Sequence, residues 1–223
     1  MTVQRGTVLS HTAMYGTGFC TNIAVQDPVT GVWRQLRPRL PPNAPLDLTS
    51  FGYDAATMRA HWQPGAQVDI DWTVPATPAR VTHPEDHLFQ AAASKLYSNR
   101  LAPAQFRQLA GLFQASSLRA LFPPIKGYHG GKQYVEDGHV LAQSVGYVEC
   151  SNVMLVTSKE ADVLTKAGES FRVAVKDAAV LARPVGTQFA DALVRFSLAN
   201  AWDGGHIGFS PERCYLMLSH VVL

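Results

Sequence analysis

Alternation of apolar and polar residues is the dominant pattern in the first part of the chain, and it predicts β-strands. The run 66–74 is the clearest case, because Val68, Ile70 and Trp72 alternate with polar residues. Residues two apart on a strand share a face, so this run predicts a half-buried strand with its polar side in water. Three further strand-prone runs precede it along the chain: 7–13, 21–27 and 32–38.

Proline and glycine mark the connections between these runs. Residues 27–31 read DPVTG, which predicts a tight connection between the second and third runs. The stretch 39–58 is rich in proline and has no periodicity, so it predicts a long loop.

The pattern changes to a helical period in the middle of the chain. Residues 82–86 read THPED, in which a capping residue, a proline and two acids are typical of a helix start. Leu88, Ala92 and Leu96 then recur at helical spacing. A second predicted helix begins at Pro103 and carries its own apolar positions: Phe106, Leu109, Ala110 and Phe113.

Strand-like patterns return in the second half. The run 171–177 alternates Phe171, Val173 and Val175 with polar residues, and longer strand-prone runs cover 147–158, 190–199 and 214–223. We therefore expect a mainly β fold with a helical insert. Its predicted parts are an N-terminal β-domain at 1–85, a helical linker at 86–124 and a C-terminal β-domain at 125–223.

Composition narrows the classes of protein. Charged residues are 16% of the chain, below the roughly 25% of typical soluble domains, while 47% are hydrophobic. No apolar run approaches the roughly 20 residues of a membrane span, and the first residues lack the apolar block of a signal peptide, so we expect a cytoplasmic protein without a membrane partner. The net charge of +2 permits a nucleic-acid partner without requiring one. The cysteines have no paired spacing and predict free thiols: Cys20, Cys150 and Cys214.

Several short motifs resemble the bacterial family of dual OB-containing domain proteins. They are VLSHTAM at 8–14, GTGFC at 16–20, WRQLRP at 33–38, WQPG at 62–65 and THPED at 82–86. This resemblance implies two OB-like β-barrels joined by the helical segment and, by analogy, nucleic-acid binding. OB folds also bind oligosaccharides and proteins, so the fold alone does not settle the function.

The leading candidate site is one face of the third strand-prone run. Its alternating positions carry Trp33, Gln35, Arg37 and Arg39. Tryptophan offers a stacking surface to a base, and arginine pairs with phosphate. An OB fold binds its ligand across its second and third strands, where this run is expected to lie. The alternative is that Trp33 faces the core and the arginines are ordinary solvated side chains.

A second candidate is the polar, Gly-rich stretch 126–139, predicted as a loop or irregular hairpin. Lys126, Tyr128 and Lys132 would hold a nucleic-acid backbone, and Arg172 with Lys176 would extend the basic surface. The stretch lacks the spacing of a phosphate-binding P-loop, and a mobile inter-domain loop is the alternative.

Catalytic patterns are weaker. Asp69 and Asp71, with Asp54 or Glu85, would hold the divalent ion of a nuclease, but strand alternation already accounts for these acids. The helix-start pattern likewise accounts better than a metal site for the spacing of His83 and His87.

We therefore expect a non-enzymatic protein without cofactor or metal. It would bind single-stranded DNA or RNA along an aromatic and basic groove with weak sequence preference. A protein-docking module and a metal-dependent nuclease are the alternatives.

Overall fold

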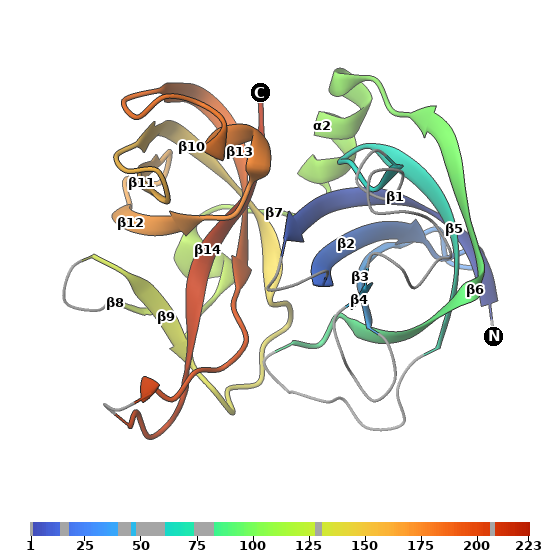
Figure 1. The fold of residues 1–223 in the computed structure, drawn as a ribbon, viewed down its shortest axis with the longest axis horizontal. Helices are drawn as coiled ribbons and strands as arrows, with labels where there is room; N and C mark the ends of the chain where they lie inside the picture. The colour runs from blue at the N-terminus through green and yellow to red at the C-terminus, as the bar shows by residue number, and fades with distance from the viewer. Residues whose placement is uncertain are drawn as a thin grey trace. The chain divides into compact units, whose positions relative to one another are not determined.

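The computed structural model describes residues 2–13, 18–39, 46–47, 61–73, 83–127, 131–205 and 208–223. The chain divides into two compact units. The first unit comprises Met1–Ala79 and Glu85–Leu112, and the second unit comprises Arg80–Pro84 and Phe113–Leu223. Curved strands dominate both units (Figure 1), which confirms the predicted β-rich fold with few helices.

Five strands of the first unit are hydrogen-bonded in a ring. They are β1 (Thr2–Ala13), β2 (Gly18–Gln26), β3 (Trp33–Arg39), β5 (Ala66–Thr73) and β6 (Asp86–Arg100). Each neighbouring pair is antiparallel except β3 and β6, which run parallel. That parallel pairing joins only residues 37–39 to 86–88, so the ring closes through a short seam. The two-residue strand β4 (Leu46–Asp47) pairs with β2.

Alternation predicts part of this unit's core correctly, but Asp71, on the face predicted to lie in water, is buried as well. Val68 and Ile70 on β5 are buried, together with Val8 on β1 and Leu36 on β3. The expected turn between β2 and β3 is also present, because the Asp27 carboxylate accepts hydrogen bonds from two backbone N–H groups of the turn.

The helix predicted from Asp86 is wrong, because Asp86–Arg100 forms strand β6. Its alanine-rich centre favours a helix locally. In the folded chain, however, β6 pairs with β5 along most of its length and with β3 at its start, and this pairing overrides the local preference. The residues just before β6 form a turn and do not cap a helix. His83 is buried, and its Nε2 lies 3.4 Å from the carbonyl oxygen of Leu198.

The second predicted helix is confirmed. Helix α2 (Pro103–Gly111) starts at the expected proline and buries Phe106, Leu109 and Ala110. The strand β7 (Gln114–Ala115) and the single-turn helix α3 (Leu118–Leu121) follow. The helices of the predicted segment 86–124 therefore lie in its second part only, because the first part belongs to the first ring.

The second unit contains a ring of the same connectivity. Its strands are β10 (Val145–Leu155), β11 (Glu160–Thr165), β12 (Ser170–Val175), β13 (Gln188–Leu198) and β14 (Arg213–Val222). They pair antiparallel except β12 and β14, whose parallel pairing joins only residues 174–175 to 217–218. Helix α4 (Ala178–Leu181) connects β12 to β13. Phe171, Val173 and Val175 are buried in the core, as the alternation predicts.

The described residues of the predicted stretch 126–139 include two short paired strands beside this ring. Strand β8 (Lys126–Gly127) pairs with β9 (Gln133–Glu136), and β9 pairs in turn with β14. No disulfide joins Cys20, Cys150 or Cys214, and burial raises the pKa of the Cys150 thiol to about 12. No helix in the described part of the chain is long and apolar enough to cross a membrane.

Candidate functional site

The side chains of the predicted stripe on β3 are mostly buried. Trp33 is half-buried, and Gln35, Arg37 and Arg39 are only 9%, 6% and 5% exposed. Arg37 donates from Nη2 to Oδ2 of Asp86 at 2.8 Å and from Nε to the other carboxylate oxygen. The predicted exposed stripe is therefore wrong, because the Arg37 guanidinium faces an acid on β6 at the parallel seam instead of facing solvent.

The predicted cations of the second unit fall into two groups. Lys126 pairs with Glu136 across the β8–β9 hairpin at 2.8 Å, and Lys176 is exposed after β12. Tyr128 lies outside the described residues. Lys132 and Arg172, by contrast, are brought together at one pocket.

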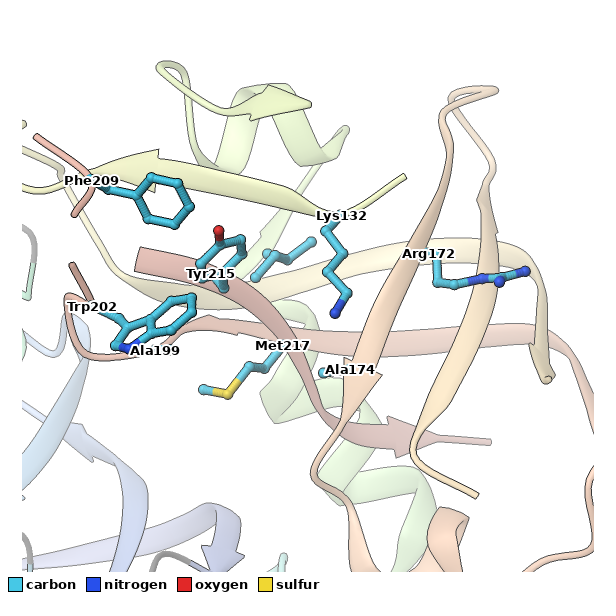
Figure 2. Close-up of a pocket in the computed structure, with 9 residues that line it drawn as sticks. Lys132, Arg172, Ala174, Ala199, Trp202, Phe209, Tyr215 and Met217 are labelled. Carbon is cyan, nitrogen blue, oxygen red and sulfur yellow. The ribbon is translucent and has the colours of Figure 1, made fainter. Parts of the chain in front are cut away.

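This pocket has a volume of about 360 Å³, within the roughly 300–1,000 Å³ of small-molecule sites. Strands β12 and β14 form part of its wall, and Ala199, Trp202 and Phe209 from the connection between β13 and β14 form another part (Figure 2). The lining residues are Lys132, Arg172, Ala174, Ala199, Trp202, Phe209, Tyr215, Leu216 and Met217. Aromatic and apolar side chains thus form most of a site with two basic residues.

Three aromatic rings of the pocket hold one another in place. The Trp202 ring centroid lies 5.9 Å from that of Phe209, nearly edge-on, and 6.0 Å from that of Tyr215. Such tilted and edge-to-face pairs are the favoured arrangements of aromatic rings. Trp202 is nevertheless 49% exposed, so part of a fixed indole ring is accessible to a ligand.

The backbone of the segment 199–212 explains how these rings are positioned. Trp202 and Arg213 exchange two backbone hydrogen bonds of 2.9 and 3.0 Å, which close the segment at its base. Gly204 has a φ of +86°, and a Cβ there would lie 2.6 Å from the ring of Phe209. The guanidinium carbon of Arg213 lies 3.7 Å from the Phe209 ring centroid, a cation–π contact on the same ring.

Acidic residues accompany both cations of the pocket. The Lys132 ammonium lies 3.5 Å from Glu160, and Arg172 donates two hydrogen bonds of 2.8 and 3.0 Å to the Asp162 carboxylate. The hydrogen bond and positive charge of Arg172 lower the pKa of Asp162, so this carboxylate is charged at neutral pH. In Figure 2 the Lys132 side chain reaches toward Met217 and Ala174, whereas Arg172 extends away from the aromatic rings.

Sequence reasoning missed the aromatic part of this pocket. Trp202 and Phe209 flank the glycines of AWDGGHIGF at 201–209, in the connection between two predicted strands. Aromatic residues in a glycine-rich connection were the available signal, because functional side chains concentrate in loops. Tyr215 and Met217 are two apart on β14 and share its face, a pattern that alternation contains but does not mark as functional.

The described acids of the alternative nuclease site are either paired or buried. Asp69 pairs with Arg5 at 3.1 Å, Asp71 and Glu85 are buried, and Asp54 lies outside the described residues. His87 Nδ1 lies 2.7 Å from the carbonyl oxygen of Glu85. Within the described ranges, no group of three or more His, Cys, Asp or Glu side chains is placed to hold a metal ion.

Comparisons with known proteins do not identify the chain. No family model and no curated protein matches its sequence. Among solved structures, a murine DNA-binding protein bound to double-stranded DNA is similar, with 11% identity and a TM-score of 0.36 over 99% of this chain and 91% of that chain. A TM-score of this size is too low to show a shared fold.

Proposed function

We propose that this chain is a non-enzymatic protein that binds single-stranded nucleic acid and takes an unpaired base into the pocket of the second unit. The observation that carries the proposal is that Trp202, Tyr215 and Lys132 line one pocket of about 360 Å³. Stacking on an aromatic side chain contributes about 1–3 kcal/mol per base and tolerates any sequence. The Lys132 ammonium is placed to interact with a phosphate beside the stacked base.

A single strand fits this pocket better than a duplex. The faces of bases in a duplex are covered by their neighbours, so a base reaches an aromatic pocket only when it is unpaired. Stacking also explains weak sequence preference, because each base has a π-face.

We further propose that both rings are OB-like barrels, in line with the resemblance to the dual OB-containing domain proteins. The support is the order of pairing, in which β10, β11 and β12 form an antiparallel meander, β12 pairs parallel with β14, and β13 pairs with both β14 and β10. OB folds bind ligands with the loop between their fourth and fifth strands. In this proposal, that loop is the segment carrying Trp202 and Phe209.

Fluorescence anisotropy of labelled single-stranded DNA, single-stranded RNA and duplex DNA tests the proposal with the full chain. We expect both single strands to bind, and Trp202→Ala to weaken them about tenfold or more, which corresponds to about 1.4 kcal/mol or more of lost stacking. Trp33→Ala is the matched control, because it removes a half-buried indole from the first unit and leaves the pocket unchanged.

Two results would contradict the proposal. One is the absence of binding to every oligonucleotide at low salt, which would favour the protein-docking alternative. The other is an equal loss of affinity in Trp202→Ala and Trp33→Ala when circular dichroism shows that both variants are folded.

A further inference from the structure

Both cations of the pocket meet carboxylates from a single strand. Glu160 and Asp162 are two apart on β11, so they share a face. In the β11–β12 pairing Glu160 lies opposite Ala174, and Asp162 lies opposite Arg172. Their ion pairs with Lys132 and Arg172 are partly exposed, with 27–51% of each side chain accessible. The charges of these four side chains sum to zero, and the Arg213 guanidinium against the Phe209 ring is a separate cation.

The position of Lys132 is also fixed by this pair of strands. The backbone N–H of Arg172 donates to the carbonyl oxygen of Gly131 at 3.3 Å, which holds the residue before Lys132 against β12. A Cβ at Gly131 would lie 3.5 Å from the Cβ of Arg172, so the two chain segments are in close contact. Lys132 therefore stays near Glu160 and has limited reach toward phosphates elsewhere.

From this arrangement we infer that Glu160 and Asp162 determine which part of a nucleic acid the pocket binds. Their carboxylates oppose contacts with phosphate, so the pocket selects an unpaired base over a phosphate backbone. The inference rests on the proposed function. A phosphate that approaches Lys132 or Arg172 must displace a carboxylate already bound there and is repelled by that carboxylate. A stacked base carries no charge and is not opposed in this way.

The inference predicts an unusually small salt dependence. For single strands, each phosphate neutralised by the protein adds about 0.7 to the slope of log affinity against log salt. We expect the wild-type slope to correspond to about one phosphate, because the Lys132–Glu160 pair at 3.5 Å is weaker than the two hydrogen bonds from Arg172 to Asp162 and is the first to be displaced. In the double variant Glu160→Gln/Asp162→Asn both cations are released, and we expect the slope to double and duplex DNA to bind several-fold more tightly at low salt.

The experiment measures anisotropy of a labelled oligothymidylate and of a duplex DNA across a salt series, with the full chain. The matched control is Glu149→Gln/Asp191→Asn, which changes the net charge equally and releases Lys166, whose partners lie at 3.2 and 3.6 Å. None of these three residues lines the pocket. Partly exposed ion pairs contribute little to stability, so both double variants are expected to fold.

The outcomes separate this inference from the proposed function. A doubled slope and a gain in duplex affinity in the pocket variant alone support the inference. If the wild type binds single strands through Trp202 but the pocket variant keeps the wild-type slope, or the control variant shifts equally, the inference is overturned while the proposed function stands. If the wild type binds nothing, or binds without dependence on Trp202, both are overturned.

Discussion

Arg37 and Asp86 form a buried ion pair at the seam where β3 meets β6. Burial disfavours the charge on Arg37, but the hydrogen bonds and negative charge of Asp86 outweigh it and raise the pKa of the guanidinium. The planar fork of arginine matches both oxygens of the carboxylate, a geometry that lysine does not reproduce. The pair is therefore best understood as part of the first unit's structure.

Removing one partner of this pair leaves the other charge buried without compensation. We expect Arg37→Ala to lower the free energy of unfolding by about 3–5 kcal/mol, measured by urea denaturation. Arg34→Ala is the control, because Arg34 makes a more exposed pair with Asp27 at 3.3 Å, and its loss is expected to cost less than about 1 kcal/mol. Equal unfolding midpoints for the two variants would show that the buried pair has no special structural role.

At the scale of elements, the glycine-rich connection between β13 and β14 positions two aromatic rings of the pocket, Trp202 and Phe209. Gly204→Ala would place a methyl group against the Phe209 ring and impose a left-handed backbone on alanine. We expect this variant to lose oligonucleotide affinity in the anisotropy assay. Gly205→Ala is the control, because its φ of +60° imposes similar backbone strain while its Cβ would have no atom within 4 Å.

If Gly204→Ala loses more affinity than Gly205→Ala, the loss is caused by displacement of the Phe209 ring. Equal affinities in Gly204→Ala and Gly205→Ala would mean that the position of Phe209 is unimportant for binding. Thermal unfolding of both variants separates this effect from a general loss of stability, because backbone strain acts on both and the clash acts on one.

Elements were predictable from the sequence where local pattern and final pairing agree. Alternation at Val68 and Ile70 identified β5, and Pro103 marked the start of α2. At β6 the local pattern and the final pairing disagree, because an alanine-rich stretch with helical spacing pairs with two other strands. Alternation also shows which side chains of β3 share a face but not whether that face is covered, so the burial of Arg37 was not predictable.

At the scale of the whole molecule, the pocket is a product of ring closure. Its lining residues come from four separate parts of the chain, which are brought together by the parallel pairing of β12 with β14 and by the contact of Gly131 with β12. Lys132 and Arg172 were identified from charge alone, without knowledge that they meet. Sequence patterns relate residues that are close along the chain. The residues of this pocket are far apart along the chain and close only in the folded structure, so no pattern could predict it.

Because the second ring closes within one unit, we expect this unit to fold without the first unit. The fragment Phe113–Leu223 contains every strand of the second ring and every lining residue of the pocket. It lacks His83, whose contact with the carbonyl oxygen of Leu198 is a long 3.4 Å, so a modest loss of stability is expected. The buried core formed by the ring's own strands supplies most of the driving force for folding.

We therefore expect this fragment to unfold cooperatively in circular dichroism and to bind single-stranded oligonucleotides with the affinity of the full chain. Trp202→Ala in the fragment is the control and should remove that binding. A folded fragment with much weaker affinity would place part of the binding surface in the first unit. An unfolded fragment would show that the second ring depends on the rest of the chain, because ring closure within one unit would then be insufficient to stabilise it.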